Sequence, residues 1–124
     1  MSLLEVLVAL GIMSVVLISL GALMFQVARH TQRAAAVGYR SAAVTSAGSW
    51  AQGLPWDSID GSTGCSQDTA GLLAYTRCTS VQSPSGRLKE IEVVVTPSGL
   101  LAIAPETVVV YRTKPKTVSP FSVN

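Results

Sequence analysis

The first 28 residues form one long apolar run whose only charged side chain is Glu5. About 20 consecutive apolar residues suffice to cross a bilayer as a helix, so this run is long enough to span a membrane. A carboxylate inside such a segment costs roughly 2.5–3.5 kcal/mol of insertion free energy, and it therefore usually has a partner and a function. The nearest opposite charge is the α-amino group at the start of the chain. We expect that amine, or the amine of a neighbouring chain, to compensate the charge of Glu5.

The rest of the chain has the composition of a small globular domain. Charged residues make up 13% of the 124 residues, and the deficit lies mostly in the apolar run. A net charge of +2 does not by itself imply a nucleic-acid partner. The two cysteines, Cys65 and Cys78, follow the apolar run, and a disulfide between them would staple a domain with a thin core. The alternatives are two free thiols or half of a metal site, but His30 is the only further soft ligand.

Helix-forming residues continue well beyond the apolar run. The chain has no proline before Pro55, so we predict one helix from Leu3 to about Gln52, ended by Gly53 and Pro55. Its second half is alanine-rich and amphipathic, with one polar stripe and one face turned to a domain. We expect bending or local melting near Ser19 and Gly21, where helix propensity is lowest. The polar stripe consists of Arg29, Arg33 and Arg40, and the apolar candidates for the opposite face are Val37, Val44 and Trp50.

Strand-like segments follow a polar, turn-rich stretch at residues 57–69, which we expect to be irregular. The clearest strand is residues 87–96, where Ile91, Val93 and Val95 alternate with other side chains. Further strands are expected at residues 72–81, 100–104 and 107–113, with turns at residues 83–86 and 97–99. Three or four antiparallel strands against the C-terminal half of a long helix give an α+β fold. The predicted organisation is a hydrophobic helix at 1–28, its amphipathic continuation at 29–54 and a β domain with an extended tail at 55–124.

The opening MSLLEVLVALGIMSVV closely resembles the mature N-terminus of type IV pilins and the related pseudopilins. In that family a peptidase removes a short basic leader, the new first residue is methylated, and a carboxylate occupies the fifth position. The resemblance therefore implies that Met1 is the processed and methylated residue. A removed basic leader would also explain why Arg29, His30 and Arg33 follow the apolar run although positive charge normally stays on the cytoplasmic side.

The resemblance implies a structural protein rather than an enzyme, with no cofactor and no metal. Such a subunit waits in the bacterial inner membrane until an assembly machinery extracts it into an extracellular helical filament of identical copies. Those filaments serve in motility, adhesion, DNA uptake or secretion. In the filament, Glu5 would meet the N-terminal amine of a neighbouring subunit. The side chains that would pack into adjacent helices are Leu3, Leu4, Val6, Leu7 and Leu10.

Two other roles within or outside this family fit parts of the sequence. A minor pilin or type II secretion pseudopilin would prime or tip a filament, and a single-pass membrane-anchored binding protein would keep a basic cytoplasmic flank.

A basic patch near the C-terminus, formed by Arg112, Lys114 and Lys116, favours an edge strand protected by charge. A second interpretation of this patch is contact with DNA or another acidic surface.

Overall fold

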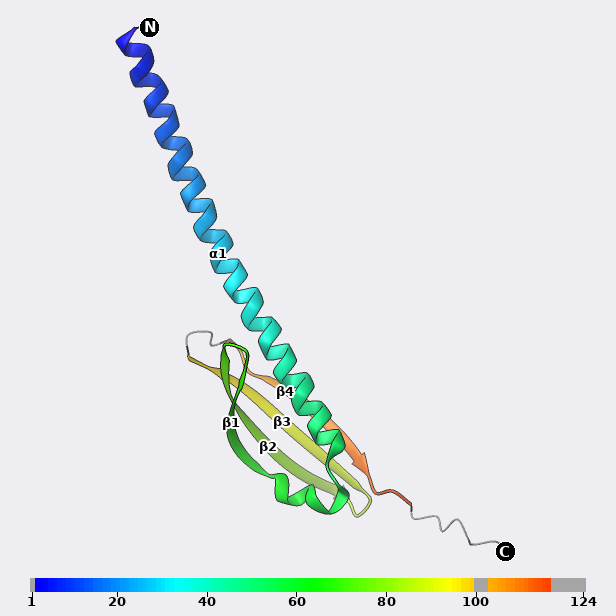
Figure 1. Ribbon diagram of the computed structural model, residues 1–124. Helices are drawn as coiled ribbons and strands as arrows, with labels where there is room; N and C mark the ends of the chain where they lie inside the picture. The colour runs from blue at the N-terminus through cyan, green and yellow to red at the C-terminus, as the bar shows by residue number, and fades with distance from the viewer. Residues whose placement is uncertain (1, 100–102, 117–124) are drawn as a thin grey trace, which may run out of the picture. The chain divides into compact units, whose positions relative to one another are not determined.

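A computed structural model of the chain describes residues 2–99 and 103–116 (Figure 1). Helix α1 (Leu3–Gly53) is followed by two short 3₁₀ helices, η1 (Trp56–Ser58) and η2 (Asp60–Ser62). Four strands come next, β1 (Gly64–Ala70), β2 (Leu73–Ser85), β3 (Leu88–Ser98) and β4 (Glu106–Thr113). The architecture is α+β, as predicted. Contacts divide the chain into an N-terminal unit, Met1–Ala35, and a C-terminal unit, Ala36–Asn124, which are described separately below.

The sheet is a simple antiparallel meander in the order β1-β2-β3-β4. Strands β1 and β2 are joined by the two residues Gly71 and Leu72, because Ala70 pairs directly with Leu73. Gly71 has a φ of +59°, and a Cβ there would come within 2.4 Å of the Tyr39 ring on α1. Glycine is therefore required at this turn both for its left-handed backbone and for its lack of a side chain.

One face of the sheet packs against the part of α1 that belongs to the C-terminal unit. The alternation predicted for β3 is confirmed, since Ile91, Val93 and Val95 are fully buried. The helix contributes its smallest side chains to this core rather than the ones that we expected. Val37 is 46% exposed, whereas Val44 and Trp50 are only partly buried. The buried helix positions are Ala36, Ala43, Ala47 and Ala51, each at most 2% exposed.

Alanine at these positions explains how a helix can lie close to a sheet of β-branched residues. A methyl group adds little thickness between the two backbones, so the valines and isoleucine of β3 fill the space between the layers. The larger apolar side chains of this part of the helix flank that contact instead of entering it. Val44 and Trp50 pack against the edge of the core, as predicted, whereas Val37 is exposed. The alanine positions at the centre of the contact were not predicted, because size rather than hydrophobicity decides which helix positions fit there.

The segment at residues 57–69, expected to be irregular, is more ordered than its composition suggests. It contains the last two residues of η1, all of η2 and the first six residues of β1. Strand β1 pairs along its full length with β2, yet six of its seven side chains are exposed. An apolar alternation is therefore absent from its sequence, and the strand exists because its backbone extends the sheet that β2 begins.

Two predicted turns lie elsewhere or are part of strands. Strand β2 continues through residues 83–85, so its turn to β3 consists of Gly86 and Arg87. Pro97 lies within β3 opposite Tyr75 rather than in a turn. Pairing of β3 with β4 stops at Val95, so the missing N–H of Pro97 falls where one side of the strand has no partner. The strand predicted at residues 100–104 lies largely outside the described residues, and residues 103–105 are irregular.

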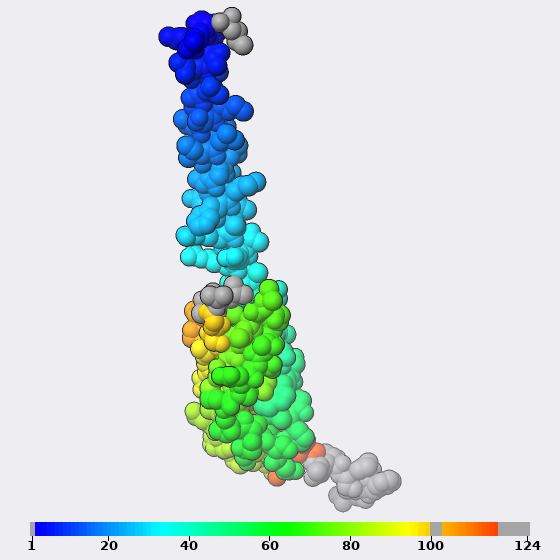
Figure 2. Space-filling model, turned by 60° about the vertical axis from the view of Figure 1, so that its left-hand side comes forward, coloured from blue at the N-terminus to red at the C-terminus, as the bar shows by residue number. Residues whose placement is uncertain are grey.

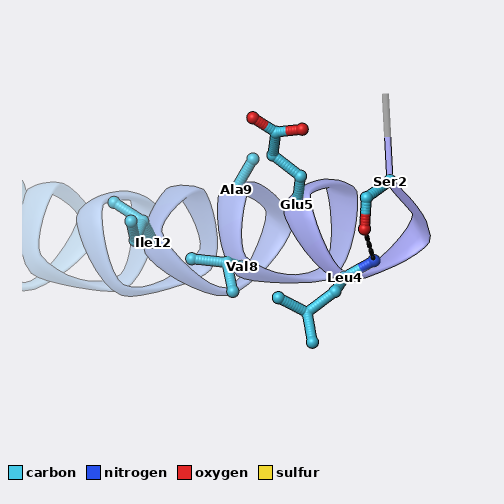
Figure 3. A pocket seen from close by; sticks show the side chains of 6 residues that line it. All are labelled: Ser2, Leu4, Glu5, Val8, Ala9 and Ile12. Atoms are coloured by element: carbon cyan, nitrogen blue, oxygen red, sulfur yellow. Dashed lines mark hydrogen bonds between the residues drawn. The ribbon is translucent and has the colours of Figure 1, made fainter.

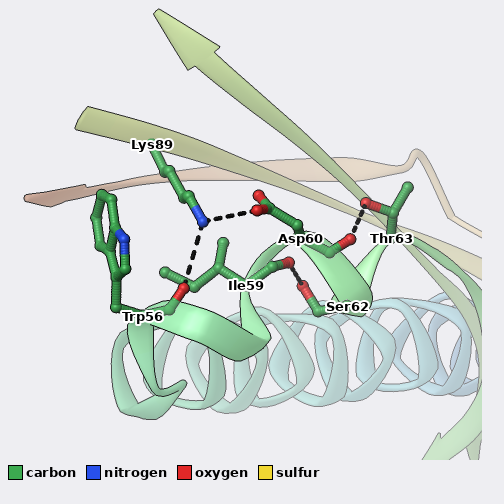
Figure 4. Close-up of polar contacts among 6 residues, drawn as sticks. All are labelled: Trp56, Ile59, Asp60, Ser62, Thr63 and Lys89. Atoms are coloured by element: carbon green, nitrogen blue, oxygen red, sulfur yellow. Dashed lines mark hydrogen bonds and ion pairs between the residues drawn. The ribbon is translucent and has the colours of Figure 1, made fainter. Parts of the chain in front are cut away.

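A buried lysine ties the segment after the helix to the sheet (Figure 4). Lys89 of β3 is 8% exposed, and its Nζ lies 2.9 Å from Oδ2 of Asp60. The same ammonium donates to the backbone carbonyl of Trp56 at 3.3 Å and lies 4.7 Å from the centre of the Trp56 ring. The ring and the carboxylate replace the water that the ammonium loses on burial. Trp56 therefore holds the loop after Pro55 on the sheet.

Candidate functional site

The N-terminal unit is a helix whose large apolar side chains are exposed along its length. Figure 2 shows one face of this helix, coloured from dark blue to cyan. Leu3 and Leu4 are 79% and 72% exposed, and apolar residues stay exposed as far as Val27. The helix is long and apolar enough to cross a membrane by length and composition, which is consistent with membrane insertion or a signal sequence. The other side chains predicted for assembly, Val6, Leu7 and Leu10, are exposed as well.

Ser2 caps the start of this helix (Figure 3). Its Oγ accepts a hydrogen bond of 3.3 Å from the backbone N–H of Leu4, and its carbonyl accepts one of 3.0 Å from Glu5. Serine followed three residues later by glutamate is the capping-box pattern. We did not recognise that pattern in the sequence, although SLLE displays it. Ser2 therefore explains why the helix begins at Leu3.

Glu5 lies in the first turn of the helix, where a negative charge is favoured by the helix dipole. Its carboxylate projects from the helix surface above Ala9 (Figure 3). Around it lies a surface hollow of about 500 Å³, otherwise lined by apolar side chains apart from Ser2. A carboxylate in such surroundings can stabilise the helix start within its own chain, and it is also accessible to a cation from another molecule. The lining residues are Ser2, Leu4, Glu5, Val8, Ala9 and Ile12.

Two further predictions concern the start and the middle of the helix. Met1, the expected site of processing and methylation, lies outside the described residues. The helix is continuous through Ser19 and Gly21, and the Ser19 hydroxyl donates to the carbonyl of Val15 at 2.9 Å. Such a bond back to the preceding turn tends to bend a helix without breaking it. The helix is therefore not melted at Gly21 in this structure, and bending there stays a prediction.

The predicted disulfide is present between Cys65 of β1 and Cys78 of β2. The two residues pair directly across the strands, which brings their Cα atoms to 4.0 Å. Because β1 buries almost no side chain, this bond and the backbone ladder are what hold the strand on the sheet. Sequence alone predicted the bond, but not that both cysteines lie on strands.

Arg112 of the predicted basic patch is turned into the C-terminal unit. Its Nη1 donates to the backbone carbonyl of Ala51 at 3.2 Å and also to that of Gln52. These are among the last carbonyls of α1, which have no partner within the helix, and the last turn has no basic residue of its own. Arg112 therefore caps the helix C-terminus across the fold. Lys114 and Lys116 are exposed, so the proposed contact with DNA rests on these two lysines.

Tyr75 of β2 lies in the core with its phenol near Asp68 and Arg77. Burial in the core raises the pKa of its phenol above 10.0, and the nearby Asp68 carboxylate raises this pKa further. Arg77 has a smaller opposing effect. Within residues 2–99 and 103–116, no group of three His, Cys, Asp or Glu side chains is placed to hold a metal ion.

The long apolar N-terminal helix, the four-stranded antiparallel sheet and the Cys65–Cys78 disulfide together form a pilin-like architecture. No protein-family model, no curated protein and no solved structure matches the chain.

Proposed function

We propose that the chain is a structural subunit, not an enzyme, which polymerises through its N-terminal helix into an extracellular type IV pilus. Before assembly it resides in the bacterial inner membrane, and a prepilin peptidase and an assembly machinery act on it. The main support is the N-terminal unit, a helix that exposes leucine, isoleucine and valine around its whole circumference and carries Glu5 as its only acidic residue. The pilin-like N-terminal sequence and the disulfide-stapled domain agree with this proposal.

Burial of the exposed side chains supplies the free energy for such a polymer. A leucine transferred from water to an apolar environment gains about 1.5–3 kcal/mol, so the helix requires a lipid or protein partner. In a bilayer that gain is already made. Packing between helices must therefore replace lipid contacts with protein contacts of similar quality. The polymer then needs a feature that selects one alignment among many similar apolar contacts.

Glu5 provides that feature in our proposal. Its carboxylate pairs with the N-terminal amine of a neighbouring subunit, so that two charges leave the lipid together. Removing one partner of a buried pair costs about 3–5 kcal/mol, since it leaves the other charge uncompensated. The pair therefore fixes the register of neighbouring helices more than it adds net stability.

The first test is the replacement of Glu5 by glutamine in cells that assemble the protein. We expect the Glu5→Gln protein to remain in the membrane fraction, while filaments sheared from the cells fall at least about 100-fold, as a loss of about 3 kcal/mol or more implies. Glu90→Gln, which removes a carboxylate from the C-terminal unit, is the matched control and should assemble like wild type. Filaments at the wild-type level from Glu5→Gln would refute the role of this carboxylate.

Mass spectrometry of the N-terminal peptide from sheared filaments tests processing. A peptide that begins at Met1 and carries one added methyl group is the expected result. A basic extension before Met1, with protein confined to the membrane, would favour the membrane-anchored binding protein instead. A processed chain present at a few copies per filament would favour the minor pilin or pseudopilin role.

A further inference from the structure

Four polar side chains lie together where the apolar segment of the N-terminal unit ends. Gln26, Arg29, His30 and Arg33 are spaced i, i+3, i+4 and i+7, so they share one face of the helix. Their side chains line a surface hollow of about 230 Å³. We call these four residues the basic stripe. The basic stripe lies at the end of the apolar segment, because no large apolar residue occurs between Val27 and Arg33.

The first arginine of the stripe is held at this boundary by an aromatic ring. The guanidinium carbon of Arg29 lies 4.4 Å from the centre of the Phe25 ring, in a cation–π contact. Phe25 is itself 59% exposed and belongs to the apolar segment. The contact keeps a positive charge within one turn of the last apolar residues, at the depth where a bilayer changes from hydrocarbon to headgroups.

The stripe has no acidic residue near it in the sequence of its own unit. Glu5 is the only acidic residue before Asp57, and it lies about 36 Å from Arg29 along the axis, given the ~1.5 Å rise per residue. Arg40, further along the same helix, differs in this respect, because its Nε lies 2.8 Å from Oε2 of Glu106. Arg40 is therefore paired with a carboxylate of the same chain. Arg29 and Arg33 of the stripe are available to an external anion.

We propose that the basic stripe binds the phosphate of an anionic phospholipid while the apolar segment is in the bilayer. This inference rests on the membrane stage of the proposed function. Two guanidinium groups one helical turn apart can each donate paired hydrogen bonds to phosphate oxygens, and His30 and Gln26 add donors on the same face. A lipid is favoured over a soluble anion because Phe25 and the stripe place apolar and cationic groups side by side, which matches a phospholipid.

The test uses the full-length chain in nanodiscs of phosphatidylglycerol and phosphatidylcholine, released gently for native mass spectrometry of the lipids that stay bound. We expect the ratio of phosphatidylglycerol to phosphatidylcholine retained by wild type to exceed the ratio in the bilayer roughly 25-fold, from about fivefold for each arginine near an anionic surface. Arg29→Gln/Arg33→Gln should retain both lipids in proportion to the bilayer. Arg33→Gln should lose part of the enrichment, and Arg87→Gln, its matched control in the C-terminal unit, should keep all of it.

Equal enrichment in wild type and Arg29→Gln/Arg33→Gln would overturn the proposal. Binding of inorganic phosphate by wild type without any enrichment of phosphatidylglycerol would also overturn it, because the stripe would then bind a free anion rather than a lipid. The same conclusion follows if a second copy of the chain replaces the lipid and is retained through Arg29. Insertion without enrichment contradicts only this inference, whereas failure to insert contradicts the proposed function as well.

Discussion

The two parts of helix α1 use apolar residues in opposite ways. In the N-terminal unit, leucine, isoleucine and valine are exposed along the helix, while in the C-terminal unit the buried helix positions are all alanine. A helix that folds onto its own sheet needs small side chains at the contact, because the sheet supplies the volume. A helix that carries its bulk on the outside is built to be covered by something else. One continuous helix thus has a part that packs on its own sheet and a part whose apolar side chains find no partner within the described chain.

The largest expected effect comes from comparing a core residue with an exposed one. Ile91→Ala should lower the free energy of unfolding of the C-terminal unit by about 2–5 kcal/mol, since Ile91 is fully buried. Leu10→Ala should leave that free energy unchanged within about 0.5 kcal/mol, because Leu10 is 57% exposed in the N-terminal unit. Urea unfolding in detergent, followed by tryptophan fluorescence, measures both. A large loss for Leu10→Ala would break the distinction between the two units.

Removing the disulfide sharpens the comparison inside the C-terminal unit. Cysteines separated by 13 positions close a loop whose loss should lower the unfolding free energy by about 2–3 kcal/mol in Cys65→Ser/Cys78→Ser. Because β1 buries almost no side chain, amide hydrogen exchange should rise first in Gly64–Ala70, with Leu88–Ser98 still protected. A uniform rise across both strands would mean that β1 is integral to the core.

Arg112 offers a smaller effect that tests its role as a helix cap. Arg112→Gln removes a charged donor from the carbonyls of Ala51 and Gln52 and should lower the unfolding free energy by about 1–2 kcal/mol. Lys116→Gln, an exposed basic residue nearby in sequence, is the control and should have no measurable effect. Equal values for the two variants in chemical denaturation would show that Arg112 does not stabilise the helix end.

The smallest effect is confined to alkaline pH. Burial and the Asp68 carboxylate raise the pKa of Tyr75, so an unfolded phenol releases its proton near pH 10 while the folded one still holds it. Stability from this group is complete below about pH 10 and is lost as pH rises through the higher pKa of the folded state. Tyr75→Phe should make unfolding less sensitive to pH above 10, whereas Tyr111→Phe, at a 63% exposed position, should match wild type. Identical pH profiles for Tyr75→Phe and wild type would remove this contribution.

Local patterns in the sequence predicted much of this fold. The alternation around Ile91, Val93 and Val95 identified β3, and Gly53 with Pro55 identified the end of the helix. The cysteine pair was sufficient to predict the disulfide. In each case neighbouring residues in the sequence hold the information, so no knowledge of distant contacts was needed.

Features that depend on distant partners were missed. Strand β1 has no apolar pattern because its side chains are exposed, and only pairing with β2 reveals it. The alanine face of α1 could be recognised only once the thickness of the sheet was known. Arg112 caps a helix end some 60 positions earlier in the chain, and no local signal links the two. The Ser2 cap is different, since SLLE is a local pattern that could have been recognised.

The exposure of β1 has a practical consequence for labelling the protein. Residues 66–69 extend a stable sheet, bury no side chain and lie next to a covalent anchor at Cys65. A short tag or a dye attached there would be rigidly held without disturbing the core. A label for imaging needs an exposed side chain on a firmly held backbone, and this strand offers both.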